Sequence, residues 1–126
     1  MSGRAGLGAA VALALGLAAC EPSGPGALTA TVSAPVPTGA VVVELIGARI
    51  TAFEGLADAR TFAAEPSAAD TVQRVIVISP TGGPFRFRIE VEDLGAEPPR
   101  GAVVDAVDPA NRRISTLTTY TVRIAR

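Results

Sequence analysis

The sequence predicts an all-β fold, an antiparallel β-sandwich of about seven to eight strands. Apolar and polar residues alternate with a period of two from Leu28 onward, most regularly over residues 85–92. Segments rich in Pro, Gly, Asp and Asn, which favour turns, separate the alternating segments. No stretch has the periodicity of an amphipathic helix of ordinary length, although residues 54–59 have the composition for a single helical turn.

Residues 1–19 have the pattern of an export signal. Arg4 precedes an uncharged segment, Ala5–Ala19, which is shorter than the roughly 20 apolar residues of a membrane span. The segment leads into Leu17-Ala18-Ala19-Cys20, which resembles the lipobox of bacterial lipoproteins, and Cys20 is the one cysteine of the chain. The resemblance implies that residues 1–19 are removed and that Cys20 carries diacylglycerol as a membrane anchor.

Residues 20–27 are expected to be the lipidated cysteine and a short tether. The segment Pro22–Gly26 contains only Pro, Gly and Ser, so it favours neither a helix nor a strand ladder. In the sorting rule of the lipoproteins that this segment resembles, an Asp after the cysteine favours the inner membrane, and this chain has Glu21. The predicted location is therefore the cell envelope, lipid-anchored, with the outer membrane favoured over the inner membrane.

Residues 28–126 are predicted to form the sandwich domain. Over residues 85–92, alternation places Phe87 in the core and Arg88 in water. The β-branched run Val75–Ile78 is typical of a strand that is covered on both sides or lies in the middle of a sheet. Tyr120 is expected to be a core residue of the last strand. The predicted strands cover residues 28–32, 41–45, 49–53, 60–63, 75–78, 85–92, 102–107 and 120–124.

The order of these segments resembles that of small secreted sandwiches of the immunoglobulin-like and cohesin-like kind. The segments that carry the resemblance are Thr29–Val32, Ala40–Leu45, Phe85–Ile89 and a final strand through Tyr120. The whole chain resembles short lipoproteins of Gram-negative, high-GC bacteria. It departs from true immunoglobulin domains, which have a Cys pair and a core Trp, because it has one Cys and no Trp. The resemblance contains no functional motif, so it implies a fold and a location rather than an activity.

Composition and charge argue against several classes of function. The chain has no His, and all 11 cationic residues are Arg. A serine nucleophile would therefore lack a His or Lys base, and zinc, haem and iron–sulfur sites would lack their usual ligands. The formal net charge is -1, and loss of Arg4 with residues 1–19 leaves 10 Arg against 12 acidic residues, a net charge of -2. Nucleic acid is therefore not an expected partner, and neither an enzymatic activity nor a cofactor is predicted.

Carboxylates and amides are the remaining groups that suit a chemical role. Asp105, Asp108 and Asn111 offer oxygen ligands for Ca²⁺. Their spacing matches no standard loop, and a turn in which Asp108 accepts backbone hydrogen bonds is the simpler interpretation.

Acid–base chemistry has three candidates, Glu90, Glu92 and Asp93. Alternation places both glutamates on a solvated face beside Arg86 and Arg88, where charged side chains need no functional explanation.

Two classes of function remain. The first is a non-catalytic envelope lipoprotein, a structural or protein-interaction module that contacts another envelope protein through an edge strand or a loop. The alternative is a ligand-binding module for glycan or calcium. Glycan-binding modules usually present exposed aromatic rings, and Phe53 and Phe62 are the rings that the core pattern does not claim.

The lipobox hypothesis predicts that Cys20→Ser prevents acylation and releases any processed product from the membrane fraction, because the acyl chains supply the anchor. Fractionation and intact-mass measurement test this. A variant that stays with the membranes after a high-salt wash and keeps the wild-type mass would contradict the assignment.

Overall fold

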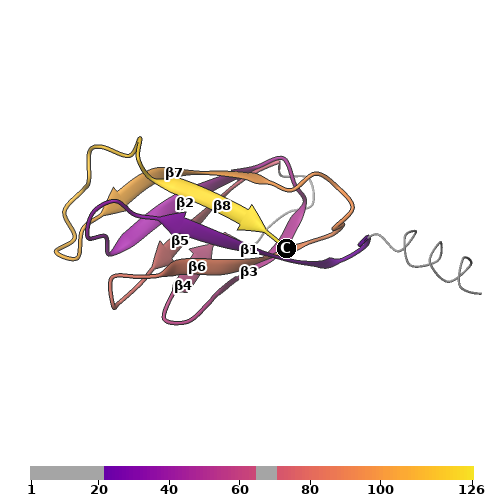
Figure 1. Ribbon diagram of the computed structural model, residues 1–126, viewed down its shortest axis with the longest axis horizontal. Helices are drawn as coiled ribbons and strands as arrows, with labels where there is room; N and C mark the ends of the chain where they lie inside the picture. Colours follow the sequence, from indigo (N-terminus) through magenta and orange to yellow (C-terminus); the bar gives the residue numbers. More distant parts are fainter. Residues whose placement is uncertain (1–21, 65–70) are drawn as a thin grey trace, which may run out of the picture.

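The computed structural model describes residues 22–64 and 71–126, which form eight β-strands (Figure 1). All predicted strands are present, and the described residues contain no helix, which confirms the all-β prediction. The strands are β1 (Gly26–Ser33), β2 (Ala40–Ile46), β3 (Ile50–Gly55), β4 (Arg60–Ala63), β5 (Val72–Ile78), β6 (Phe85–Val91), β7 (Arg100–Val107) and β8 (Thr121–Ala125).

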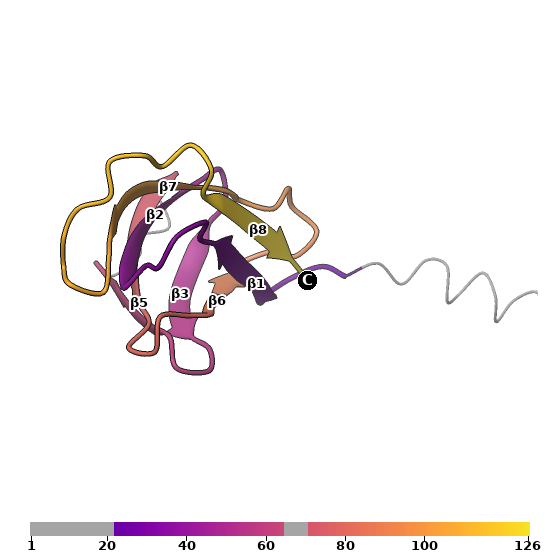
Figure 2. The ribbon, with the colours of Figure 1, turned by 60° about the vertical axis from the view of Figure 1, so that its left-hand side comes forward.

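The strands form two four-stranded antiparallel sheets that pack face to face. Sheet A has the order β3-β6-β1-β8, and sheet B has the order β4-β5-β2-β7. Figure 2 shows β2 and β5 in one layer and β1 and β8 in the other. Along the two sides of the sandwich, β3 lies beside β4 and β7 lies beside β8. The predicted β-sandwich is thereby confirmed.

The core is filled from one face of each strand. On β6 all four apolar residues are buried, whereas Arg86 and Arg88 are exposed, so the predicted register of this strand is confirmed. Phe87 is fully buried, and its ring centroid lies 6.3 Å from that of Phe53 on β3. The buried apolar side chains are Leu28, Ala30, Val32, Val41, Val43, Leu45, Ile50, Ala59, Val75, Val77, Phe85, Phe87, Ile89, Val91, Ala106 and Tyr120.

Tyr120 belongs to the core as predicted, but it directly precedes β8. Its hydroxyl lies 2.7 Å from Oγ1 of buried Thr38. Because Thr38 donates its own hydroxyl proton to the Val36 carbonyl oxygen at 2.8 Å, Tyr120 is the donor in this pair. The bond attaches the end of the long β7–β8 connection to the β1–β2 loop.

The folded part of the chain begins earlier than the sequence predicted. Gly26 already pairs with Val91 in the β1–β6 ladder. Upstream of it, the Gly24 N–H donates to Oδ1 of Asp93 at 2.9 Å, and the Gly24 carbonyl oxygen accepts the Leu94 N–H at 2.8 Å. Residues 24–27, expected in the tether, are therefore held by the domain.

Of the two alternatives predicted for Val75–Ile78, the second is confirmed: β5 lies in the middle of sheet B, between β4 and β2, and it is not covered on both sides, because Ile76 is 43% exposed. One local expectation needs correction. Residues 56–59 form a turn instead of a helical turn: the Ala59 N–H donates to the Leu56 carbonyl oxygen at 3.0 Å, and Ala57 has a φ of 53°. A positive φ does not occur in a right-handed helix.

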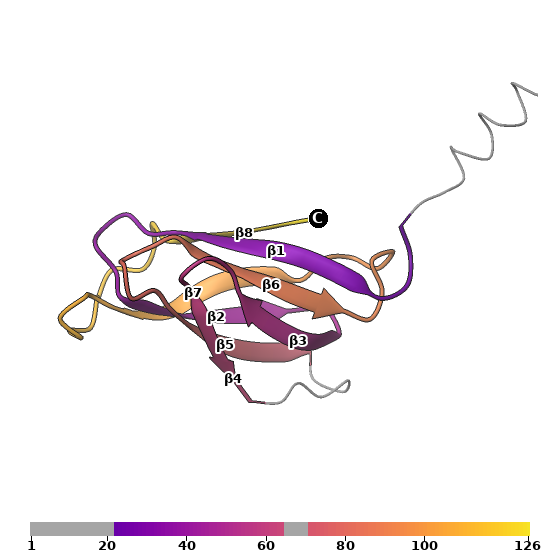
Figure 3. The same cartoon turned by 90° about the horizontal axis from the view of Figure 1, so that it is seen from below.

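The two ends of the sandwich carry different connections. At one end, called the tether end, the N-terminal chain leaves the domain next to the β2–β3 turn, the β6–β7 loop and Arg126 (Figures 1 and 3). The far end carries the connections β1–β2, β3–β4, β5–β6 and β7–β8. The strands run between these ends, so the position of the N-terminal chain orients the whole domain.

We expect Phe87→Ala to lower the free energy of unfolding by about 3 to 5 kcal/mol, because it leaves a cavity in the core. The neighbouring Arg88→Ala should change it by no more than about 0.5 kcal/mol, because that side chain is in water. Urea melts of chains that lack residues 1–19 and carry Cys20→Ser measure both effects. Equal losses in the two variants would contradict the register of β6.

Candidate interaction face

The outer face of sheet A is polar. On β6 the outward residues are charged, and Arg88 lies opposite Glu54 of β3 and Thr29 of β1. Glu90 lies on this face, as predicted. The remaining outward positions of β1 and β8 are small or polar, namely Ala27, Thr31, Ser33, Thr121, Arg123 and Ala125. Nothing on this face distinguishes it from an ordinary solvated surface.

The outer face of sheet B carries most of the exposed apolar side chains. Of the six large apolar side chains that are most exposed in the described residues, five belong to strands of sheet B, and the sixth, Val36, lies in the β1–β2 loop. We call this outer surface the B face. Its apolar residues are the exposed Ile46, Phe62, Val72, Ile76 and Val104 and the half-buried Val42, Ile78 and Val107. Its charged residues are the pair Arg74 and Glu44 on the inner strands, and Arg60, Arg100 and Asp105 on the edge strands.

Antiparallel pairing arranges the B face in rows across the strands. Each row joins residues directly opposite one another on β4, β5 and β2, and successive rows are two residues apart along a strand. On the two inner strands one charged row lies between two apolar rows. From the far end to the tether end these rows are Phe62, Ile76 and Val42; Arg74 and Glu44; and Val72 and Ile46. The last of them continues to Arg100 on β7, and a further row at the far end joins Arg60, Ile78 and Ala40.

The charged row is an ion pair across the two central strands. Nε of Arg74 lies 3.0 Å from Oε2 of Glu44, and the arginine is far more exposed than the glutamate. An exposed pair of this kind contributes at most about 1 kcal/mol to folding. Its main consequence is that the centre of the apolar face carries one charge of each sign.

A shallow hollow lies beside the apolar rows, over β2 and β7. The β2–β7 register shifts so that Val42 faces Asp105 while Val43 faces Val103, which makes Val104 the extra residue of a β-bulge. The hollow has a volume of about 180 Å³. Its lining is apolar except for Asp105 and consists of Ala40, Val41, Val42, Ile76, Asp105, Ala106 and Val107.

Of the calcium candidates Asp105, Asp108 and Asn111, both carboxylates are engaged in local contacts. Oδ1 of Asp105 accepts the Ala106 N–H at 2.9 Å, and Oδ2 lies 3.3 Å from Nη2 of Arg113. The Asn111 N–H donates to the Asp108 carbonyl oxygen at 2.9 Å. Within residues 22–64 and 71–126, no three acidic or cysteine side chains gather as a metal site requires.

Asp108 has the turn role that the sequence predicted. Its Oδ1 accepts the N–H groups of Ala110 at 2.9 Å and Arg112 at 2.8 Å, and its Oδ2 lies 3.1 Å from Nε of Arg112. The N–H of Arg112, with the charge of its guanidinium, lowers the pKa of Asp108. The carboxylate therefore organises the β7–β8 connection.

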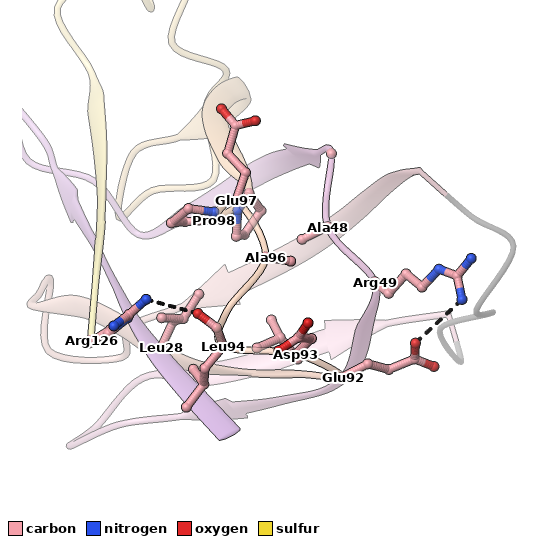
Figure 4. A pocket seen from close by; sticks show the side chains of 13 residues that line it. Leu28, Ala48, Arg49, Glu92, Asp93, Leu94, Ala96, Glu97, Pro98 and Arg126 are labelled. Atoms are coloured by element: carbon pink, nitrogen blue, oxygen red, sulfur yellow. Dashed lines mark hydrogen bonds and ion pairs between the residues drawn. The ribbon is translucent and has the colours of Figure 1, made fainter. Parts of the chain in front are cut away.

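A cleft of about 420 Å³ opens at the tether end between the β2–β3 turn and the β6–β7 loop (Figure 4). Leu28 and Leu94 contribute to its apolar lining. Arg126 donates from Nη2 to the Leu94 carbonyl oxygen at 2.8 Å, and Nη1 of Arg49 lies 3.6 Å from Oε2 of Glu92. The arginines at this cleft are thus tied to the β6–β7 loop and the end of β6.

Two of the three acid–base candidates, Glu92 and Asp93, line this cleft, and both are engaged in other contacts (Figure 4). Glu90 is on the outer face of sheet A, Glu92 is paired with Arg49, and Asp93 accepts backbone N–H groups. Oδ1 of Asp93 accepts the N–H groups of Gly95 at 2.8 Å and Gly24 at 2.9 Å. These bonds, with that of Gly95 foremost, lower the pKa of Asp93 because they favour its charged form. Asp93 therefore fixes the point at which the N-terminal chain leaves the domain.

The two aromatic rings proposed for glycan binding have different environments. Phe53 is half-buried and packs against Phe87. Phe62 is 54% exposed, but its neighbours across the strands are Ile76 and Val42, which offer no hydrogen-bonding groups to a sugar. The ring suits an apolar partner better than a glycan.

Cys20 lies outside the described residues, so its acylation stays a prediction. In the part of the chain that the structure describes, no helix is long and apolar enough to cross a membrane. No family model, no curated protein and no solved structure matches this chain.

Sequence reasoning did not find the B face. The pattern of Val75–Ile78 fits a strand covered on both sides as well as one in the middle of a sheet, and the sequence does not show that Phe62 lies beside it. The one local signal was charge: Glu44 and Arg74 interrupt two apolar segments at outward positions.

Asp93→Ala should release residues near Gly24 and speed the hydrogen exchange of the Gly24 and Gly95 amides. Because the folded-state pKa of Asp93 is lowered, its contribution to stability is present above the ordinary carboxyl pKa of about 4 and is lost as the pH falls through the folded value. Urea melts from neutral pH to below pH 3 should therefore show a wild-type advantage that disappears in acid.

The matched control is Asp58→Ala, at an exposed position in the turn after β3. It should leave both amides protected. Unchanged exchange of Gly24 in Asp93→Ala would show that this carboxylate does not hold the N-terminal chain.

Proposed function

We propose that this chain is a lipid-anchored, non-catalytic interaction module of the cell envelope, and that the B face is its contact surface. The observation that carries the proposal is the contrast between the two outer faces of the sandwich: in the described residues, sheet B carries five of the six most exposed large apolar side chains and sheet A carries none. Contiguous exposed apolar surface is uncommon on monomeric proteins and marks sites that bind other molecules.

Three of the four edge strands are poorly suited to pairing with another strand. Strand β4 has four residues, and both β3 and β7 carry register irregularities, which are features that discourage addition of a further strand. The fourth edge, β8, is regular but has only five residues and lies beside β7 of the other sheet. The edge-strand contact predicted from the sequence is therefore replaced in the proposal by contact through a sheet face.

The anchor in this proposal rests on the lipobox at Leu17–Cys20. The structure supports it indirectly: Gly24, four residues after Cys20, is attached to the β6–β7 loop at one end of the domain. Chain geometry limits those four residues to about 14 Å. Acylation at Cys20 would hold the tether end next to the membrane.

The alternative function, a module for glycan or calcium, has weaker support. The exposed ring of Phe62 has aliphatic neighbours across the strands. Oxygen atoms of Asp105 and Asp108 are already bonded to neighbouring residues.

Site-specific photocrosslinking in intact cells tests the proposed contact surface. A photoreactive residue at Ile76 should form covalent adducts with a neighbouring protein, because this side chain is exposed on an inner strand of the B face. The matched control at Arg86, on the outer face of sheet A, should form few. Equal labelling from the two positions, or none from Ile76, would contradict the assignment.

A further inference from the structure

We propose that the B face binds the B face of a second copy of this chain, with a twofold axis parallel to the strands and midway between β2 and β5. The inference rests on the proposed function, which makes the B face the contact surface, and it adds the identity of the partner. Twofold dimers are built from one self-complementary patch on each copy. The arrangement of the B face meets that requirement.

Charge complementarity selects this axis. The rotation exchanges β5 with β2 and keeps each row at its own height along the strands. Arg74 of each copy then faces Glu44 of the second copy, so opposite charges meet twice at the centre. A twofold axis perpendicular to the strands, in the plane of contact and through the same row, would instead place Arg74 over Arg74.

The apolar rows also match under this rotation. Ile76 faces Val42 of the second copy, and Val72 faces Ile46. Phe62, on β4, falls over β7 of the second copy, next to the hollow of about 180 Å³ beside the bulge. The exposed ring of Phe62 on one copy therefore lies close to the hollow on the other copy. Aromatic side chains that fill such hollows often contribute most of the binding energy of an interface.

The same axis agrees with membrane anchoring. The N-terminal chain leaves the domain at one end of the strands (Figure 1). Because the axis runs along the strands, both copies would have their tether ends on the same side. Both Cys20 residues would then reach one membrane. The perpendicular axis would direct the two tether ends in opposite directions.

The size of the face predicts a weak dimer. Four strands about 4.8 Å apart give a surface only about 20 Å across, which places the contact at the low end of specific interfaces. We expect dissociation constants of micromolar or weaker for chains in solution.

The test uses a chain that lacks residues 1–19 and carries Cys20→Ser, because both sheets and the buried core lie within residues 22–126. Sedimentation velocity from about 10 µM to 1 mM, the range set by a weak interface, should show a monomer–dimer equilibrium. Ile76→Glu should abolish the dimer, because it buries a charge against Val42. The control Arg86→Glu, on the outer face of sheet A, should leave it unchanged.

A charge-exchange experiment tests the axis itself. The Arg74→Glu chain has two acidic residues in the central row, and the Glu44→Arg chain has two arginines. Each alone should self-associate at least about tenfold more weakly than the wild type, a loss typical of like charges at an interface. An equimolar mixture should form a heterodimer, because each acidic pair then faces an arginine pair.

Any of three results would overturn the inference: a wild-type chain that stays monomeric throughout the concentration range, a dimer that tolerates Ile76→Glu, or a mixture that does not restore association. A monomeric chain whose Ile76 adduct in cells contains a different protein would contradict the second copy and uphold the proposed function. Binding of the unlipidated chain to anionic vesicles through Ile76 would make the membrane the occupant and contradict both.

Discussion

The packing of the inward side chains of β6 against sheet B is the constraint on which the rest of the structure depends. Because side chains of a strand alternate between its faces, a slip of one residue would bring Arg86 and Arg88 into the core in place of Phe85 and Phe87. Burial of unpaired charges is so unfavourable that this strand has one acceptable register. Its ladders to β1 and β3 then fix the register of those strands as well.

The fold could be predicted because this constraint is visible locally. Strict alternation of charge and apolarity on β6, and turn residues between strands, were sufficient for the strand count and for an all-β class. The B face could not be predicted, because Val75–Ile78 carries apolar residues on both faces, and Glu44 marks the outward side of β2 without showing which strands lie beside it. The grouping of outward residues depends on which strands become neighbours, a long-range property, and on the bulge in β7.

The charged pair on the B face has a physical consequence for specificity. A wholly apolar surface would accept many partners and would promote nonspecific association. Arg74 and Glu44, placed between two apolar rows, penalise any partner that does not supply a charge of each sign in the right positions. The B face therefore combines apolar contact, which has no preferred direction, with a charged pair on the two inner strands that favours one arrangement of the partner.

A weak contact and a short membrane anchor suit one another. A dimer of low affinity in solution is populated when both copies are confined near one surface, because tethering raises the effective concentration of each copy for the other. Confinement to the membrane favours the dimer only if the contact surface faces other copies in the plane of the membrane. Asp93 and Leu94 fix Gly24 at the end of the sandwich, and the strands extend away from that end. With the anchor at Cys20, the strands would rise from the membrane, and the B face would be turned toward neighbours in the same leaflet instead of toward the lipid.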